Sequence, residues 1–107
     1  MRRPCVEILY FDGCPNHGPA RALVERIAAQ LRIDPEIELV EVVDPGAAGE
    51  LRFLGSPTIR VDGRDVEPGA EQRGEFVLSC RVYRTERGLA RQPAEAWIRD
   101  ALRGAAR

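Results

Sequence analysis

Short runs of apolar, β-branched and aromatic residues predict four strands. The first strand is expected over residues 6–12, the second over 37–43 and the third over 58–61. The second run has apolar residues at both odd and even positions, which is typical of a sheet covered on both faces. The Asp-Gly pair at 62–63 is a strong hairpin signal, so residues 64–67 are expected to return antiparallel as a fourth strand.

Apolar residues at intervals of three and four predict helices between these strands and after them. Leu23 and Ile27 lie four apart in a helix expected over residues 19–32, so their side chains form a stripe that faces the sheet. A short helix is expected to begin at residues 44–45, because aspartate caps a helix and proline fits its first turn. The last helix is expected over residues 94–103.

Residues 68–92 separate the fourth strand from the last helix and form an insertion. Loops of this length without structure of their own are uncommon and often serve as lids or binding loops. Within the insertion, residues 76–84 are rich in apolar and aromatic side chains. We expect this part to form another strand or a flap packed against the rest of the protein.

The composition is that of an ordinary globular protein. The chain has 107 residues, which predicts a single domain over residues 1–107. Hydrophobic residues make up 44% and charged residues 31%. The net charge is −1, with 16 basic and 17 acidic residues, so we expect neither a nucleic-acid nor a membrane partner, since either would favour a basic surface.

The cysteines indicate free thiols. The chain has no apolar stretch of the length of a signal peptide or a membrane span, so a cytoplasmic location is expected. In that reducing compartment an odd number of cysteines, three, indicates thiols with a chemical or a packing role and not a disulfide framework. Cys5 precedes the first strand and is interpreted as structural or incidental.

Cys14 is the strongest candidate for chemistry, because it follows the first strand and precedes the first long helix. Unpaired N–H groups and the helix dipole at such a position lower the pKa of a thiol. His17, the only histidine, lies three residues on, where an imidazolium would stabilise the thiolate further. His17 as a merely polar residue of the first turn is an equal alternative. Asp12 is a candidate acid or base, although a turn-forming role beside Gly13 is favoured.

The element order, with Ser56-Pro57 leading into the third strand, resembles the thioredoxin superfamily over nearly the whole chain. The resemblance implies a thioredoxin-like α/β fold, with a central mixed four-stranded sheet, helices on both faces and an insertion before the last helix. It implies that Pro57 is the family's cis-proline, and that the backbone of Ser56, with Thr58 beside it, pairs with an extended substrate. The family's Cys-x-x-Cys is Cys-Pro-x-His here, so no disulfide can close within this turn.

Cys80 is the candidate second thiol. The predicted hairpin returns the chain to the end of the sheet that carries Cys14, where the insertion then begins. We therefore expect Cys80 to lie over Cys14. If residues 79–84 are themselves the fourth strand, Cys80 lies near the far end and the pairing fails. The other interpretation of Cys80 is a small buried residue of the sheet, which is the usual place of a free cysteine.

The favoured function is that of a small thiol–disulfide oxidoreductase. In this interpretation Cys14 attacks as a thiolate, and Cys80 or an external low-molecular-weight thiol resolves the mixed disulfide. The expected partners are therefore proteins or low-molecular-weight thiols and disulfides. The reaction needs no organic cofactor, so none is expected.

Two alternatives remain open. The segments around Cys14, Pro57 and Cys80 resemble small bacterial thioredoxin-like proteins that are often labelled alkylmercury lyase-like. That resemblance implies a soft metal ion bound by Cys14 and Cys80, with Asp12 as the acid. A four-ligand zinc site is not expected from three scattered cysteines and one histidine. The second alternative is a binding module that keeps the fold and lacks the chemistry.

Overall fold

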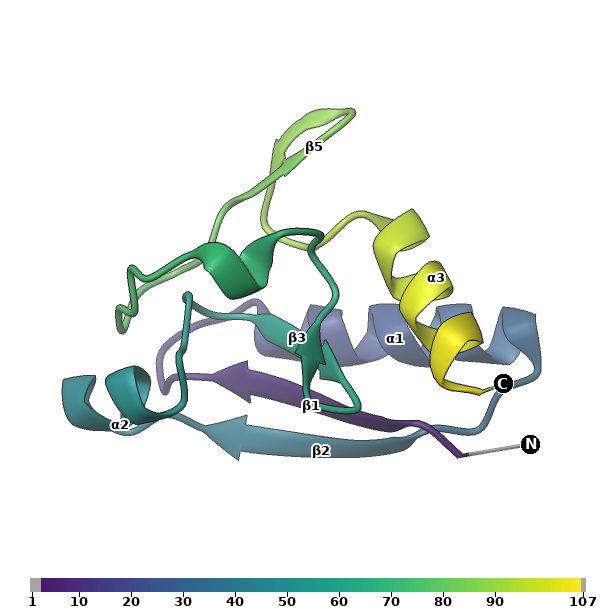
Figure 1. The fold of residues 1–107 in the computed structure, drawn as a ribbon, viewed down its shortest axis with the longest axis horizontal. Coiled ribbons are helices and arrows are strands. Elements are labelled where there is room, and N and C mark those ends of the chain that lie inside the picture. The colour runs from purple at the N-terminus through teal and green to yellow at the C-terminus, as the bar shows by residue number, and fades with distance from the viewer. Residues whose placement is uncertain (1–2, 107) are drawn as a thin grey trace.

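The computed structural model describes residues 3–106, which form a sheet with helices packed against it (Figure 1). The elements along the chain are β1 (Cys5–Tyr10), α1 (His17–Leu31), β2 (Glu36–Glu41), α2 (Pro45–Glu50), β3 (Thr58–Val61), β4 (Arg64–Asp65), the short 3-10 helix η1 (Ala70–Gln72), β5 (Tyr83–Thr85), β6 (Gly88–Ala90) and α3 (Glu95–Ala105). Strands and helices thus alternate in the first half of the chain, as predicted.

Four of the strands form one mixed sheet in the order β2-β1-β3-β4. Strand β1 is parallel to β2 and antiparallel to β3, and β4 is antiparallel to β3. In this register Val6 lies opposite Ile37 on one side and Val61 on the other. Neighbouring strands therefore present apolar side chains together on one face. The predicted mixed four-stranded sheet is confirmed.

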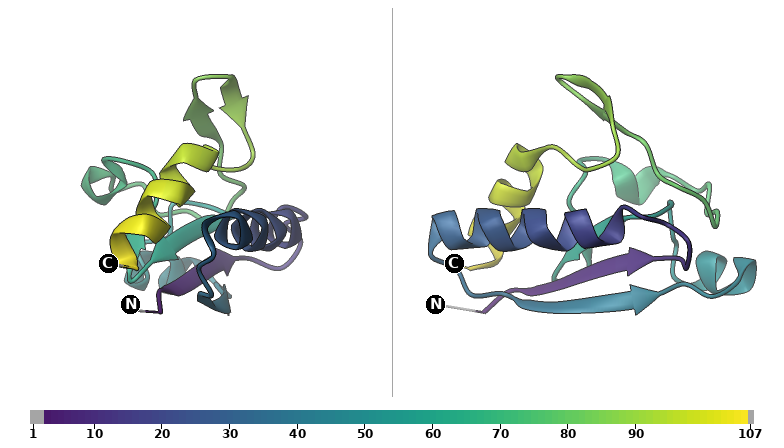
Figure 2. Two further views of the ribbon diagram at one scale, coloured as in Figure 1. Left: turned by 90° about the vertical axis from the view of Figure 1, so that its right-hand side faces the viewer. Right: turned by 180° about the vertical axis from the view of Figure 1, so that it is seen from behind.

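Helices α1 and α3 cover the same face of this sheet and lie against each other (Figure 2). Ile8 of β1, Ile27 of α1 and Ile98 of α3 are fully buried in one apolar cluster. The interval of four between apolar residues of α1 produces this packing, because such residues lie on one side of a helix. The larger part of the apolar core lies between these two helices and the sheet.

The opposite face is covered only near the end of β1, where Leu9 packs in a second apolar cluster with Ala48 of α2. Farther back on this face, Glu7 lies opposite Glu38 and Arg60. Burying such charged side chains without partners would be costly, so no helix packs over them. The expectation of helices on both faces is therefore correct only at this end of the sheet.

Strand β2 is the edge strand of the sheet and is more exposed than its sequence suggests. It ends at Glu41, two residues before the predicted end, and Leu39 within it is 39% exposed. The continuous apolar pattern predicted a strand buried on both faces. That interpretation is wrong, since a strand at the edge has a neighbour on one side only and α2 covers just one end.

The predicted hairpin after β3 is confirmed. Asp62 and Gly63 have φ values of 50° and 83°, the left-handed conformation that a tight two-residue turn of this kind requires. The returning strand β4 is shorter than expected, because only Arg64–Asp65 pairs with β3 and not the whole of residues 64–67.

The insertion does not form the continuous strand expected over residues 76–84. Its only paired strands among the described residues are β5 and β6, which form a hairpin that projects beyond the helices (Figures 1 and 2). Residues 77–81, before β5, lie beside the loop that precedes β3 and are hydrogen-bonded to it. The alternative prediction, a packed flap, describes this stretch better.

The helices of the described chain are short. Helix α1 has 15 residues and α3 has 11, against about 20 apolar residues for a span of the bilayer. No helix within residues 3–106 combines the length and the apolar character that crossing a membrane requires.

Candidate functional site

Cys14 lies in the turn between β1 and α1. Gly13 before it has a φ of 97°, which glycine adopts without steric cost. The N–H of Cys14 donates to the carbonyl oxygen of Phe11 at 3.2 Å. Helix α1 begins three residues later, at His17. The turn fixes Cys14 at the end of β1, and the residue is only 2% exposed.

The sulfur of Cys14 contacts the loop before β3. Its Sγ donates to the carbonyl oxygen of Ser56 at 3.7 Å, so the contact is made by the protonated thiol. No backbone N–H of residues 3–106 donates to this sulfur, because α1 begins farther along the chain. The sequence interpretation had N–H groups facing the thiol, and a carbonyl oxygen faces it instead. The bond between Ser56 and Pro57 is cis, as predicted.

The insertion brings Cys80 beside the same loop. Cys80 forms an isolated parallel bridge with Ser56. The N–H of Ser56 donates to the carbonyl oxygen of Ser79, and the N–H of Arg81 donates to that of Ser56, both at 2.8 Å. The Cys14 sulfur contacts the carbonyl oxygen of the same Ser56, so the two cysteines meet at this residue. Both cysteines are free, and Cys80 is exposed whereas Cys14 is buried.

The surroundings of Cys80 raise the pKa of its thiol. Partial loss of water raises the pKa of the Cys80 thiol, and Cys14 raises that pKa further through its charge when ionised and through their hydrogen bond. The positive charge of Arg91 opposes these effects.

The groups that the sequence analysis assigned to substrate binding are occupied by the protein itself. Both backbone groups of Ser56 pair with the insertion, so the expectation of a free Ser56 backbone is wrong. The hydroxyl of Thr58 is buried, donates to the carbonyl oxygen of Gly55 at 2.6 Å and accepts from Arg81 at 3.0 Å. Ser56 and Thr58 therefore hold the insertion in place and are not free to bind a substrate.

His17 contacts the backbone of Cys14. Its Nδ1 lies 2.9 Å from the carbonyl oxygen of Cys14. A carbonyl oxygen can only accept, so Nδ1 carries the proton of this hydrogen bond. The imidazole ring also stacks on Tyr10, with ring centroids 4.3 Å apart. His17 thus supports the turn that carries Cys14, from the first position of α1.

Two other candidate residues lie apart from the thiol pair. Asp12 is exposed in the turn before Cys14 and makes no hydrogen bond or ion pair with any other residue in the described part of the chain. Cys5 lies at the opposite end of β1, where its backbone N–H donates to the carboxylate of Asp62 at 2.9 Å. Partial desolvation and the nearby Glu36 raise the pKa of the Cys5 thiol.

Arg81 is a further residue of this region that was not expected from the sequence, and its side chain is 1% exposed. Its guanidinium donates to Asp65 at 2.8 Å and to Glu67 at 2.6 Å. The guanidinium also lies 4.3 Å from the centre of the Tyr83 ring, and the Tyr83 hydroxyl donates to the carbonyl oxygen of Pro57 at 2.5 Å. Arg81 therefore holds the insertion to β4 and the residues after it, and Tyr83 holds it to the loop before β3.

Burial by itself lowers the pKa of Arg81, but Tyr83, Asp65 and Glu67 together raise it above the ordinary value. The guanidinium therefore remains charged in its buried position. A weak signal for this cluster exists in the sequence. Asp65 and Glu67 are two apart, as are Arg81 and Tyr83, so each pair would share one face of an extended segment.

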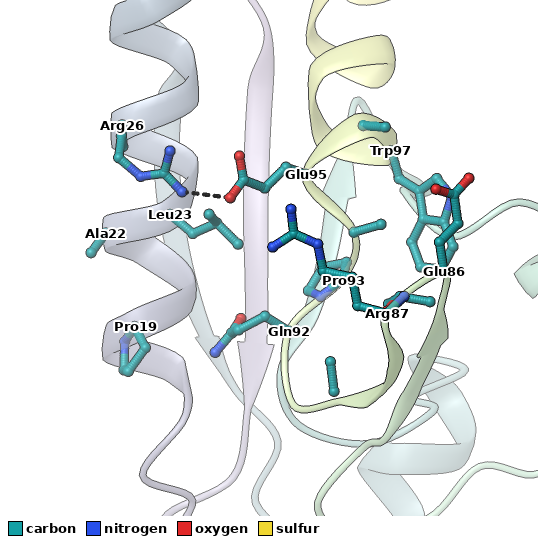
Figure 3. A pocket seen from close by; sticks show the side chains of 14 residues that line it. Pro19, Ala22, Leu23, Arg26, Glu86, Arg87, Gln92, Pro93, Glu95 and Trp97 are labelled. Carbon is teal, nitrogen blue, oxygen red and sulfur yellow. Dashed lines mark hydrogen bonds and ion pairs between the residues drawn. The ribbon is translucent and has the colours of Figure 1, made fainter.

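A large cavity of the described residues lies away from both thiols. It has a volume of about 820 Å³ and lies between α1, the beginning of α3 and the β5–β6 hairpin (Figure 3). Leu23, Pro93 and Trp97 line it, and Arg26 and Glu95 form an ion pair across it. Neither Cys14 nor Cys80 lines this cavity.

A metal site would have only the two thiols. Residues 3–106 contain no group of three or more histidine, cysteine, aspartate or glutamate side chains placed to hold a metal ion. Comparison with known proteins adds no assignment. No protein-family model matches the chain, and no curated protein is significantly similar to it. The function must be inferred from the geometry around Cys14 and Cys80.

Proposed function

We propose that the protein is a thiol–disulfide oxidoreductase that uses Cys14 and Cys80 as its redox pair. The observation that carries the proposal is that two free cysteines, one from the turn before α1 and one from the insertion, meet at Ser56: the Cys14 sulfur contacts its carbonyl oxygen, and Cys80 forms a backbone bridge with it. Cysteines that lie side by side while far apart in sequence are suited to forming a reversible disulfide.

We propose further that the fold is thioredoxin-like. The order of the elements, the position of Cys14 between β1 and α1, and Pro57 before β3 support this assignment. In place of a second cysteine in the turn, the chain has His17, which supports the backbone of Cys14. The second thiol then comes from the insertion.

The proposed reaction is a two-electron exchange. In the reduced protein, the thiols of Cys14 and Cys80 together give two electrons and two protons to a substrate disulfide. One sulfur–sulfur bond breaks in the substrate and one forms between the two cysteines, so the substrate leaves as two thiols. Excess external thiol reverses the reaction. The exchange requires no organic cofactor or metal.

Mapping the disulfide tests this proposal. The Cys5→Ser variant, in which only the two proposed redox thiols remain, is equilibrated with mixtures of reduced and oxidised glutathione and then digested for mass spectrometry. We expect one intramolecular cross-link, between Cys14 and Cys80, that forms and disappears reversibly with the glutathione ratio. Failure to form it at any ratio, in a folded protein, would disprove the redox function.

A second candidate function is binding of a soft metal ion. Two adjacent thiols without a third ligand suit a soft ion of low coordination number. Cleavage of a carbon–mercury bond would also need an acid, and Asp12, the candidate for it, is exposed and makes no hydrogen bond to Cys14 among the described residues. We therefore limit this alternative to binding.

A titration with mercury distinguishes the redox function from the metal-binding function. Titration of the reduced Cys5→Ser variant with Hg²⁺ should give a tight one-to-one complex if the pair is a metal site, and Cys14→Ser or Cys80→Ser should weaken it. Tight mercury binding without any reversible disulfide favours the metal function. If neither a reversible disulfide nor tight mercury binding is found, a non-catalytic binding module on this fold is favoured.

A further inference from the structure

Segment 79–81 of the insertion occupies the backbone edge beside Cys14. The N–H and the carbonyl oxygen of Ser56 are the groups that an extended chain would have to pair with to approach the Cys14 sulfur. Both are already bonded, to Ser79 and to Arg81. Cys80, between these two residues, therefore lies against Cys14 in the way that a cysteine of a bound peptide would.

The segment is held firmly in this position. Arg81 is buried and bonded to Asp65, Glu67 and Thr58. A side chain at Gly55 would place its Cβ 2.9 Å from the Cβ of Arg81, so the two backbones approach as closely as glycine allows. An external peptide could pair with Ser56 only after this whole arrangement had come apart.

Access to the two sulfurs is unequal. Cys14 is 2% exposed, and its sulfur is covered by Ser56 and Cys80. Cys80 is exposed to solvent. A thiol or disulfide that reacts with Cys14 or Cys80 must reach that sulfur in line with the bond that forms or breaks. For this geometry, only Cys80 offers such an approach from outside.

Resting on the proposed redox function, we propose that the substrate is a low-molecular-weight disulfide or thiol and not an extended polypeptide, and that Cys80 carries the mixed disulfide. The thiolate of Cys80 attacks one sulfur of the small disulfide, whose bond breaks and releases a first thiolate. The thiolate of Cys14 then attacks Cys80, releases the second thiolate and closes the disulfide between the two cysteines. Water supplies a proton to each released thiolate and takes one from each cysteine.

This order differs from the one expected from the sequence, in which Cys14 attacks first. A helix start favours negative charge on a nearby sulfur, whereas the order proposed here follows from which sulfur a reagent can reach. By microscopic reversibility, a small thiol that reduces the protein also attacks Cys80 and releases Cys14. The raised pKa of the Cys80 thiol predicts that its attack speeds up as the pH rises.

Single-thiol variants test which cysteine carries the mixed disulfide. In the Cys5→Ser background, Cys14→Ser leaves only Cys80 and Cys80→Ser leaves only Cys14. With oxidised glutathione as the probe, we expect the adduct on Cys80 to form at least about tenfold faster than the adduct on Cys14, since access limits the buried thiol. An equal or faster reaction of Cys14 would overturn the proposed order.

The substrate class is tested with two disulfides on the reduced Cys5→Ser protein. One is oxidised glutathione, and the other is a disulfide-linked peptide with several residues on each side of its cysteines. We expect glutathione to react at least about tenfold faster, because the peptide cannot pair with Ser56. Equal rates would overturn the proposed substrate class and leave the redox function intact, because the mapped disulfide tests that function separately.

If segment 79–81 is held less firmly, the preference for oxidised glutathione over the disulfide-linked peptide should become smaller. Arg81→Met removes the bonds that hold segment 79–81 and should reduce the ratio of the two rates, whereas Arg84→Met, an exposed arginine of β5, should leave the ratio unchanged. Tyr83→Phe replaces Arg81→Met if the latter does not fold, since it removes only the hydrogen bond to Pro57. If a folded variant has the same ratio of the two rates as the wild type, segment 79–81 does not exclude the peptide from Ser56 and its proposed role is overturned.

Discussion

Two parts of the molecule are held in place by different interactions. Helices α1 and α3 pack on the sheet through apolar side chains such as Ile27 and Ile98. Segment 79–83 of the insertion is instead held by hydrogen bonds and charges, chiefly those of Arg81. Apolar burial is non-directional and fixes a helix on a face, whereas hydrogen bonds have defined partners and fix a segment in one register. That register keeps Cys80 opposite Ser56.

The largest effect is expected for Arg81→Met. The substitution leaves Asp65 and Glu67, whose side chains are 10% and 17% exposed, without their cation. Removing one partner of a buried ion pair typically lowers the free energy of unfolding by about 3 to 5 kcal/mol. Because Cys80 is then held less firmly, the disulfide to Cys14 should also become easier to reduce. Denaturant unfolding and a glutathione redox titration measure the two effects.

The matched control lies in the other region. Ile27→Ala removes buried apolar atoms of α1 and should lower the free energy of unfolding by about 2 to 5 kcal/mol, a loss of similar size. It leaves the contacts around Cys80 intact, so the redox titration should be unchanged. If Arg81→Met and Ile27→Ala shift the disulfide equilibrium equally, the polar contacts of Arg81 do not position Cys80 specifically, and the proposed difference between the two regions is wrong.

A smaller, pH-dependent effect is expected for Tyr83→Phe. Tyr83 is fully buried, donates to the carbonyl oxygen of Pro57, and has its pKa raised, mainly by burial. The folded protein therefore keeps this proton above a pH of about 10, at which the unfolded chain releases it. The stability that depends on the protonated Tyr83 is complete below that pH and declines as the pH rises beyond it.

At neutral pH, Tyr83→Phe should lower the free energy of unfolding by about 0.5 to 1.5 kcal/mol, the usual contribution of one hydrogen bond. Toward pH 11 or so, the wild type should lose stability faster than the variant, because only the wild type has the Tyr83 proton to lose. Unfolding curves across this pH range give the measurement. Parallel pH profiles would show that the Tyr83 hydroxyl does not support the segment.

The difference between the two regions also explains what the sequence could predict. The packing of α1 follows from apolar residues spaced by four, and the turn at Asp62 follows from the residue beside it, so both are visible in a local pattern. The attachment of the insertion depends on Arg81 meeting Asp65 and Glu67, which are distant in the sequence. The spacing of two within each pair indicates a shared face, but no local pattern shows that Arg81 meets Asp65 and Glu67, and only the folded chain brings them together.

The position of the thiols is an intermediate case. The order of the elements predicted that Cys14 would follow β1, and that the hairpin would return the chain to this end of the sheet. The expectation that the Ser56 backbone would be free was wrong, because its pairing depends on the exact register of segment 79–81. A shift of one residue along Ser56 would turn the Cys80 side chain away from Cys14.

The smallest effect is expected for an ion pair in the region of apolar packing. Arg26 of α1 donates to Glu95 of α3 at 2.9 Å, almost the distance between Arg81 and Asp65. The side chains of Arg26 and Glu95 are 49% and 50% exposed, against 1% for Arg81. Water and salt weaken an exposed pair, while a buried one keeps its full electrostatic and desolvation terms.

Glu95→Gln should therefore change the free energy of unfolding too little to separate from the wild type in physiological salt, although the distances alone suggest equal interactions. The Arg26 hydrogen bond and charge lower the pKa of Glu95, so any stability from the pair is present near neutral pH and is lost as the pH falls through that pKa. Unfolding at low and high salt is the measurement. A loss as large as that of Arg81→Met would mean that proximity, and not burial, decides the strength of these contacts, and the contrast between the two regions would then have to be abandoned.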